Sequence, residues 1–285
     1  MCNVYKSSLP IVVAAALALA ACGTDNSEEQ TAARELAAAD SMISNGAYAS
    51  ALSALDSIEV HYPKNIDVRR HVHNLRPRAI ERYTIEQIQR ADSLIAATQE
   101  EIAGLENEFT HVSGGDLEGY YLHKSYKSQA FTNTTGVQPR VNDADFRFYL
   151  VASNNGSKLN IRRLAYVISG KEYISEAIPA GSERSTALEG GELATFLPEE
   201  VDSIGKIGFE STAPVTEIVL IGDNGRRKVK VSQSQAEGLV KSWRYGNQKN
   251  QLRSALILRE KLDRQLQTAR DQIANRATDD AESQH

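Results

Sequence analysis

Cysteine is scarce in this chain, and an excess of charge of one sign is lacking as well. Its 285 residues include 2 cysteines, too few for the disulfide framework of a small secreted scaffold. The 32 Lys and Arg residues against 37 Asp and Glu residues give a formal net charge of -5, which creates no global field that attracts DNA, RNA or an anionic lipid surface. With 7 prolines and 41% hydrophobic residues, a collagen-like or disordered chain is excluded, and one large domain or two modest ones are expected.

Sequence motifs of catalysis are also missing. The chain contains no Gly-x-Ser-x-Gly elbow, no Gly-x-x-x-x-Gly-Lys-Ser/Thr phosphate loop, no Gly-x-Gly-x-x-Gly and no His-Glu-x-x-His. His71 and His73 flank one residue, which on a helix places them about 200 degrees apart, so they cannot face one metal ion. Glu199 and Glu200 follow Pro198, where acidic residues usually interact with the dipole of a helix start. We therefore predict a protein that is not an enzyme, without catalytic, metal-binding or cofactor-binding residues.

The N-terminus has the layout of a secretory signal. Residues 1–21 carry one charged side chain, Lys6, ahead of an apolar run that is too short to span a bilayer stably. The run ends in Leu19-Ala20-Ala21-Cys22-Gly23, which resembles the lipobox of bacterial lipoproteins. The resemblance implies that residues 1–21 are removed and that the Cys22 thiol accepts diacylglycerol, so that three acyl chains anchor the mature protein in a membrane. The alternative is an ordinary cleaved signal in which Cys22 occurs by chance.

Two further expectations depend on this resemblance. Cys2 lies in the discarded segment, so the mature protein has no free thiol for a nucleophile or a thiolate metal site. The residue after Cys22 is Gly23, whereas an Asp there resembles an inner-membrane retention signal in enterobacteria-like lipoproteins, so the outer membrane is favoured. The polar, acidic residues 22–30 are expected to form a flexible tether.

Residues 31–76 predict a helical hairpin. Apolar and small residues recur at helical spacing on both sides of Asn45-Gly46, which is typical of a helix C-cap followed by a turn. The run from Gly46 to Pro63 resembles a tetratricopeptide repeat, and it contains Tyr48, Ala51, Leu52, Leu55, Ile58 and Tyr62 in the matching order. No second copy follows at the period of about 34 residues that such repeats use. The alternative is a simple helical hairpin with small residues at its crossing.

Two distant segments share a seven-residue apolar period. We expect Pro77 to start or kink a new helix, and residues 77–111 and 247–276 to form two long helices. Their stripes consist of Ile88, Ala91, Ile95, Thr98, Ile102, Leu105 and Phe109, and of Leu252, Ala255, Arg259, Leu262, Leu266, Ala269 and Ile273. Such narrow stripes need a partner, so we predict an antiparallel coiled-coil stalk in which Ile102 lies near Leu258. The alternative is pairing with another chain, and residues 277–285 are expected to be a disordered tail.

The residues between these helices, 112–246, predict a β-rich head. Short apolar or alternating segments are separated by turn signals, and Asn155-Gly156, Gly170-Lys171 and Asp223-Asn224-Gly225 are expected to close hairpins. Candidate strands are 120–126, 145–152, 159–168, 172–178, 207–210, 217–221 and 228–231. Helices are expected from Pro198 to about Ile204 and over 232–243. Most aromatic residues lie in this region, and we interpret them as core residues.

These patterns together predict an α+β fold with a helical hairpin, a coiled-coil stalk and a β-rich head inserted between the two stalk helices. The predicted function is that of a lipid-anchored, non-enzymatic interaction or scaffold protein of the bacterial cell envelope, with a protein partner there. The alternative is a lipoprotein whose head binds a small ligand or glycan, which requires a cleft with aromatic walls and a few convergent polar groups. An enzyme would require a pocket with perturbed carboxylates or histidines.

Overall fold

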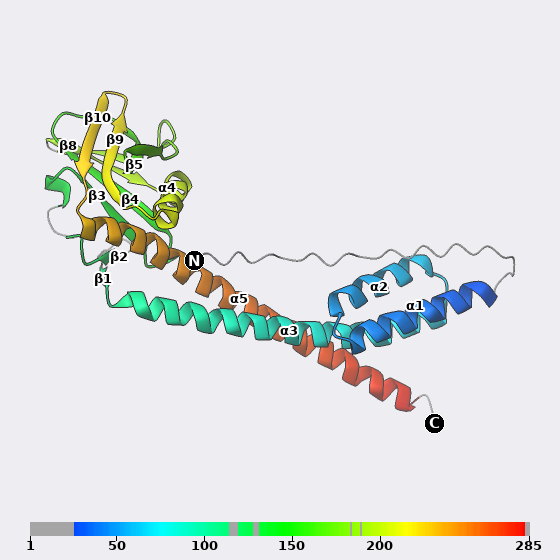
Figure 1. Cartoon of the computed structure of the whole chain (residues 1–285). Helices are drawn as coiled ribbons and strands as arrows, with labels where there is room; N and C mark the ends of the chain where they lie inside the picture. Colours follow the sequence, from blue (N-terminus) through cyan, green and yellow to red (C-terminus); the bar gives the residue numbers. More distant parts are fainter. Residues whose placement is uncertain (1–25, 114–118, 128–130, 183, 189, 283–285) are drawn as a thin grey trace. The chain divides into compact units, whose positions relative to one another are not determined.

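The computed structural model describes residues 26–113, 119–127, 131–182, 184–188 and 190–282 (Figure 1). The predicted signal segment, Cys22 and the first residues of the predicted tether lie outside these residues. The described chain is α+β, as predicted, and it divides into two compact units. The first unit consists of Met1–Tyr83 and Leu266–His285, and the second of Thr84–Gln265.

The first unit is helical. The helices α1 (Asn26–Ser44) and α2 (Tyr48–His61) form the expected hairpin, and Gly46 adopts a φ of 79° in the turn between them. The start of α3 (Ile66–Glu106) packs against both helices. Their common core is formed by Ala32, Ala39, Leu55, Ile58, Tyr62, Val68, Val72 and Ala79. A single hairpin is therefore completed by a third helix instead of a second repeat.

Several helix boundaries differ from the prediction. The predicted tether, 22–30, is helical from Asn26 onward, because α1 begins there. The helix α3 begins at Ile66 and runs through Pro77 instead of starting at it. The helix α5 (Gln233–Glu282) joins the two helices predicted around Gly246, and it extends into the predicted tail. No helix in the described part of the chain is long and apolar enough to cross a membrane.

The long helices α3 and α5 pack against each other in antiparallel directions. In the second unit, Asp92 pairs with Arg259 at 2.7 Å and Glu106 pairs with Lys249 at 3.1 Å, so the partners run in opposite directions along the two helices. The buried side of α3 follows the predicted stripe, with Ile88, Ala91, Thr98, Ile102 and Leu105 all buried. On α5 the buried members are Ala255, Leu262 and Ala269, and the other predicted members are half-buried.

The predicted register of these helices was wrong. Glu101 accepts hydrogen bonds from Gln248 Nε2 at 2.7 Å and from Arg244 Nη2 at 3.0 Å, which places Ile102 across from this part of α5. Leu258 lies further along and is 48% exposed. Because a seven-residue period repeats itself along the helix, the sequence pattern alone does not distinguish one heptad register from the next.

The second unit contains two antiparallel sheets, both between α3 and α5 in the chain. The larger sheet has the order β1-β2-β3-β4-β8-β7 and the smaller one β10-β9-β5-β6. The strands are β1 (Phe109–Val112), β2 (Tyr120–His123), β3 (Gly136–Asn142), β4 (Phe148–Asn155), β5 (Ile161–Ile168), β6 (Lys171–Ile174), β7 (Ser185–Leu188), β8 (Gly191–Phe196), β9 (Val215–Gly222) and β10 (Gly225–Lys230).

The core of this unit lies between the two sheets. It contains Phe148, Leu150 and Phe196 from the larger sheet, and Leu164, Tyr166, Ile218 and Leu220 from the smaller one. The helix α4 (Pro198–Glu210) adds Val201 and Ile204, and the start of α5 adds Ala236 and Leu239. A separate cluster joins Phe109 and Val141 of the larger sheet to Tyr245 of α5, with Tyr121 packed against it. The interpretation of most aromatic residues as core residues is therefore confirmed for these positions.

Local turn signals were more reliable than strand signals. The β5–β6 and β9–β10 hairpins form as predicted, with Ser169-Gly170 and Asp223-Asn224 in their loops. Asn155-Gly156 ends β4 without closing a hairpin, because β4 pairs with β3 and β8 instead of β5. The predicted strand 207–210 is the end of α4, and β1, β3, β7 and β8 were not predicted.

Candidate functional site

The candidate site lies between the free edges of two strands, β3 and β10. The strand β10 is the last strand of the smaller sheet and pairs only with β9 among the described residues. The strand β3 pairs with β2 only through Val141 and Asn142, so its first half has no neighbour on that side in the described chain. We call the space between these two edges the seam.

Alternate N–H and C=O groups of β10 point away from its neighbour β9. The Val231 N–H donates to the Thr216 carbonyl, so Val231 and Thr216 form a hydrogen-bonded pair. With the register of the two strands, this identifies Val229 and Arg227 as the next residues of β10 that are hydrogen-bonded to β9. Because such pairs alternate along antiparallel strands, the N–H and C=O groups of Arg226, Lys228 and Lys230 point away from β9. No other strand pairs with these three residues in the part of the chain that the structure describes.

The opposite edge, on β3, offers fewer such groups. The Asn142 N–H donates to the Arg147 carbonyl, so that Val137 and Pro139 direct their backbone groups away from β4. Pro139 has no N–H to offer. Proline is a common device for protecting a sheet edge from pairing, and this leaves β10 as the edge better able to accept a strand.

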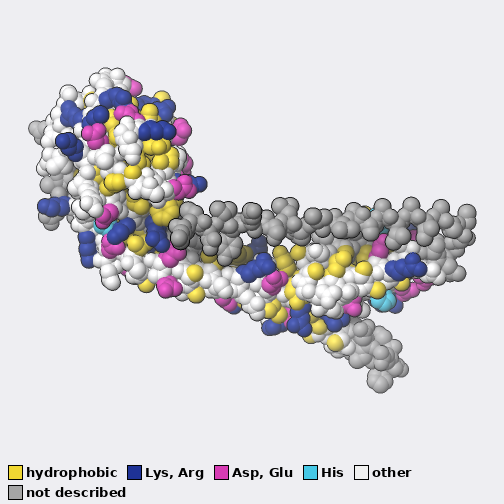
Figure 2. Space-filling model, in the orientation of Figure 1, with side chains coloured by type: hydrophobic (Ala, Val, Ile, Leu, Met, Phe, Trp, Pro, Cys, Tyr) yellow, Lys and Arg dark blue, Asp and Glu magenta, His cyan; other side chains and the backbone are white. Residues whose placement is uncertain are grey.

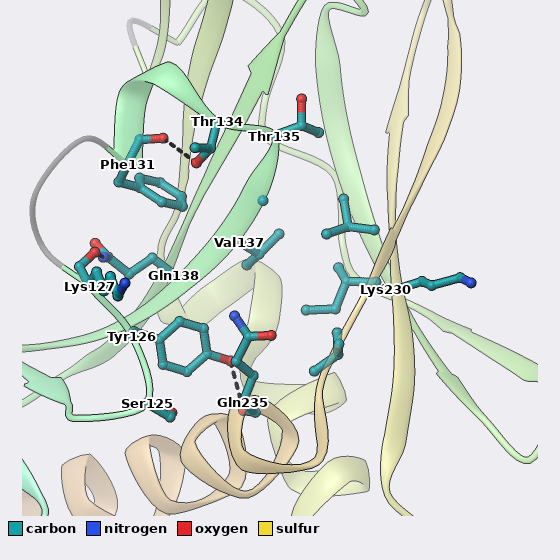
Figure 3. Close-up of a pocket in the computed structure, with 14 residues that line it drawn as sticks. Ser125, Tyr126, Lys127, Phe131, Thr134, Thr135, Val137, Gln138, Lys230 and Gln235 are labelled. Carbon is teal, nitrogen blue, oxygen red and sulfur yellow. Dashed lines mark hydrogen bonds between the residues drawn. The ribbon is translucent and has the colours of Figure 1, made fainter.

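A cavity of about 470 Å³ lies in the seam. Figure 3 shows Val137 on one wall, with Phe131 and Tyr126 on the same side, and the strand that carries Lys230 on the opposite wall. The apolar part of the lining consists of Tyr126, Phe131, Val137, Ile218, Val229 and Val231. Val229 and Val231 are only half-buried, although their neighbour Ile218 lies in the core. The sandwich core is therefore incompletely filled at this point.

Polar groups at the cavity are already hydrogen-bonded to the protein. The Tyr126 hydroxyl donates to the Gln235 carbonyl at 2.8 Å, and burial raises the pKa of this tyrosine well above its usual value, so it stays protonated. The Gln138 amide donates to the Lys127 carbonyl at 2.9 Å and accepts from Arg140 at 2.7 Å. The walls are consequently mostly apolar, and the polar groups of Tyr126 and Gln138 are engaged with the protein itself.

Basic side chains lie on the outer face of β10. Arg226 pairs with Glu172, Lys228 pairs with Glu217 at 3.2 Å, and Lys230 points away from the cavity (Figure 3). These three cations outnumber the two carboxylates that pair with them. Elsewhere on the visible face of this unit, basic and acidic side chains are interspersed (Figure 2). This basic cluster therefore lies on an edge strand.

A buried histidine network borders the cavity at Ser125. His123 Nδ1 lies 2.8 Å from the Ser125 hydroxyl, and its Nε2 lies 3.2 Å from Glu108, which also pairs with Lys241. Burial lowers the pKa of His123, while the hydrogen bond from Lys241 lowers the pKa of Glu108. The sequence did not predict this network, because its members are spread over the link between α3 and β1, the end of β2 and the turn after it, and α5.

This network has the order of a serine–histidine–carboxylate triad, but its serine is covered. A Cβ atom at Gly238 of α5 would lie 2.2 Å from Ser125 Oγ and 2.5 Å from His123 Nδ1, so the α5 backbone packs directly on their hydrogen bond. A nucleophile needs free approach to its substrate. The arrangement is suited to holding the start of β1, the end of β2 and α5 together.

The residues considered from sequence as metal or acid–base sites are not brought together. His71 and His73 are exposed on α3, and the described residues contain no group of three potential metal ligands. Glu200 caps α4 by accepting from the Leu197 N–H at 2.8 Å, and it pairs with Arg184. Glu199 pairs with Arg147. Their assignment to a helix start is therefore confirmed, whereas the predicted acylation site Cys22 lies outside the described residues.

Other hollows also occur in the described chain, and two of them are larger than the cavity in the seam. A groove of about 510 Å³ lies between α1 and α3 in the first unit, with Leu36 and Leu75 in its floor. A hollow of about 630 Å³ lies beside the end of α4 and the start of α5. Neither is bordered by the free edge of a strand, so the seam is the candidate in which apolar walls and unpaired backbone groups coincide.

Comparison of the chain with protein-family models, with curated proteins and with solved structures finds no match.

Proposed function

We propose that the protein is a lipid-anchored, non-enzymatic interaction protein of the bacterial cell envelope, and that its β-rich head recognises a protein partner at the seam. The observation that carries this proposal is the cavity of about 470 Å³ between two strand edges, one of which has unpaired backbone groups. An enzyme would need reactive groups in such a place, whereas the polar side chains here are bonded to the protein itself.

In this proposal, the lipid anchor and the long helices hold the head at a distance from the membrane. Cys22, in its lipobox-like surroundings, would hold the chain at a membrane, with the outer membrane favoured by Gly23. The antiparallel helices α3 and α5, with their three-and-four spacing of buried residues, would act as a coiled-coil stalk into which the head is inserted. The single tetratricopeptide-like hairpin would lie at the membrane-proximal end of the chain.

A small ligand or glycan in the same cavity is the second candidate. The rings of Tyr126 and Phe131 at its wall favour this candidate, since aromatic rings stack on sugars and other flat ligands. The polar groups that would orient a small ligand are engaged with other parts of the protein. We therefore place the protein partner first.

Photo-cross-linking in cells tests the head. Benzoylphenylalanine in place of Phe131 should give an adduct in which the protein is linked to a second envelope protein, because this side chain lies at the cavity. The matched control places the same group at Ile174, which is 51% exposed on β6 away from the seam. A small-mass adduct at Phe131, measured by mass spectrometry, would establish the ligand candidate instead. Equal adducts at both positions would contradict recognition at the seam.

Metabolic labelling tests the anchor. A fatty-acid analogue should label the wild-type chain and fail to label Cys22→Ala, because the thiol that accepts the lipid is gone. The matched control is Cys2→Ala, which removes the other cysteine of the chain and should leave labelling unchanged. Labelling that persists in Cys22→Ala would refute acylation at this residue.

A further inference from the structure

We infer that the occupant of the seam is an extended peptide strand, with alternating apolar and acidic side chains, that adds to the free edge of β10. This inference rests on the proposed function and specifies the chemistry of its partner. It joins three observations on the same strand, namely the direction of its unpaired backbone groups, the unfilled apolar wall inside it and the basic face outside it.

The backbone of β10 determines how the partner binds. The outward N–H and C=O groups of Arg226, Lys228 and Lys230 are arranged to form a ladder with a fifth strand of the smaller sheet. Main-chain hydrogen bonds of this kind supply affinity in complexes where an extended peptide extends a sheet. The strand β3 cannot serve in the same way, because Pro139 removes one of its donors.

The two faces of β10 determine which side chains the partner carries. Successive side chains of an added strand point alternately to the two faces of the sheet. One set enters the cavity beside Val229, Val231 and Ile218, where aliphatic side chains of the partner fill the incomplete core. The other set lies beside Lys228 and Lys230 on the outer face, where the cations exceed their carboxylate partners, so acidic side chains are favoured there.

The existing ion pairs keep the edge open. Arg226 and Lys228 are held over the outer face by Glu172 and Glu217, and Arg227 donates to the Asn155 carbonyl at 2.9 Å. None of these interactions uses the backbone groups of the edge. A partner strand therefore gains hydrogen bonds without breaking any that the described chain already makes.

Fluorescence anisotropy with a labelled peptide tests the inference. The probe is a short peptide in which glutamate and valine alternate, and the protein is a soluble form that begins at Asn26. Lys228→Pro removes the outward N–H and should weaken binding about tenfold or more relative to Lys228→Ala, which loses the same charge but keeps the N–H. Circular dichroism tests whether both variants are folded. If Lys228→Pro is not folded, Lys230→Pro and Lys230→Ala are compared instead.

Two controls separate the possible outcomes. A peptide of the same composition with glutamates and valines in blocks should bind at least about tenfold more weakly, since it cannot match both faces at once. In the wild-type protein, amide hydrogen exchange followed by NMR should slow at Lys228 and Lys230 when the alternating peptide is added, whereas the amide of Val229 is already protected by β9.

Equal affinities of Lys228→Pro and Lys228→Ala, or unchanged exchange at Lys228 and Lys230, would overturn strand addition. Failure of the alternating peptide to bind, together with a protein adduct at Phe131 in cells, would also overturn it while leaving the proposed function standing. Failure of both experiments would reject the seam as a recognition site altogether.

Discussion

Glu192 has a fully buried carboxyl group that accepts hydrogen bonds from N–H groups of the protein. Its Oε1 accepts from the Leu159 N–H at 2.6 Å and from the Asn154 side chain at 3.1 Å, and its Oε2 accepts from the Ile161 N–H at 3.2 Å. A carboxylate so placed on β8 fastens the larger sheet to the start of β5. Nothing in the local sequence Gly191-Glu192-Leu193 distinguishes it from a surface glutamate.

We expect Glu192→Ala to lower the free energy of unfolding by about 3 kcal/mol, because several buried N–H groups lose their acceptor together. Glu192→Gln should fall between this variant and the wild type, since an amide keeps one accepting oxygen. The control is Glu210→Ala, which removes an exposed carboxylate 3.8 Å from Lys206 and should change stability by less than about 0.5 kcal/mol. Urea denaturation measures all three, and equal effects of Glu192→Ala and Glu210→Ala would contradict this role.

His123 should make the protein sensitive to mild acid. Burial lowers its folded-state pKa despite Glu108 and Glu237, which favour the charged form, and Lys241 lowers that pKa further. The unfolded chain, with a histidine pKa of about 6.5, therefore binds a proton first as the pH falls. The contribution of neutral His123 to the free energy of unfolding is therefore full above about pH 6.5. It decreases as the pH falls below that value, until His123 is protonated in the folded state as well.

Glu108 extends this effect to lower pH, because its lowered pKa contributes stability that is lost as the carboxylate is protonated. Thermal melts between about pH 8 and pH 5 should show a decline that His123→Gln reduces, since glutamine does not titrate. If the variant kept the wild-type pH profile, another group would be responsible for the decline.

At the scale of elements, two glycines give opposite expectations. A Cβ on Gly205 of α4 would lie 2.3 Å from Cδ1 of Trp243, whose indole is held by a hydrogen bond to Asp202 at 2.8 Å. Gly205→Ala should therefore destabilise the protein by about 2 kcal/mol through overpacking. Gly104 of α3 has no atom within 4 Å of such a Cβ, so Gly104→Ala should stabilise it by up to about 1 kcal/mol.

Melting temperatures compare these two alanine variants directly. Gly205→Ala should melt below the wild type and Gly104→Ala above it, although both changes favour the helical state equally in propensity. A higher melting temperature for Gly205→Ala would mean that α4 and α5 do not approach each other as closely as described.

Helices and hairpins could be predicted where the pattern that indicates them lies within a short stretch of sequence. The stripes of α3 and α5 and the hairpins predicted at Gly170-Lys171 and Asp223-Asn224-Gly225 depend on residues close in sequence. The stripes and both hairpins form, with loops displaced from the predicted residues by no more than one position. The end of α4 was misassigned because Ile207 and Phe209 alternate with Gly208 like a strand. The packing of Gly205 on Trp243 and of Gly208 on Tyr166, which accounts for the helix, involves residues far away in the sequence.

The seam could not be predicted in the same way. A strand was predicted over residues 228–231, within and just after β10, but the free edge depends on which strands pair, and that is a non-local property. The short register of β2 against Val141 and Asn142 leaves the first half of β3 uncovered. Pro139 within β3 also lowers any sequence signal for a strand, so one wall of the cavity was missing from the prediction.

At the scale of the whole molecule, the head extends into the long helices. Phe109 stacks on Tyr245 with ring centroids 4.2 Å apart, and Ala236 and Leu239 of α5 lie in the sandwich core. The predicted head boundaries, 112–246, would therefore cut through a packed cluster. The second compact unit, Thr84–Gln265, keeps that cluster intact.

We expect a fragment of residues 84–265 to melt cooperatively, and a fragment of residues 112–246 to melt at least about 10 °C lower, because it loses Phe109 and β1. Circular dichroism of the two purified fragments measures the difference. Equal melting temperatures would show that residues 112–246 fold independently of the flanking helical segments.

The charged edge of β10 also bears on self-association. A lipid anchor confines its protein to two dimensions, where neighbouring copies meet often and an open strand edge invites them to pair. Two such edges brought together would place Arg226, Lys228 and Lys230 of one copy against the same residues of the next, and like charges across a ladder repel. With the proposed anchor and partner, the edge of β10 would accept an acidic strand and repel a second copy of itself, so that a high density of copies at the membrane would not lead to aggregation through this edge.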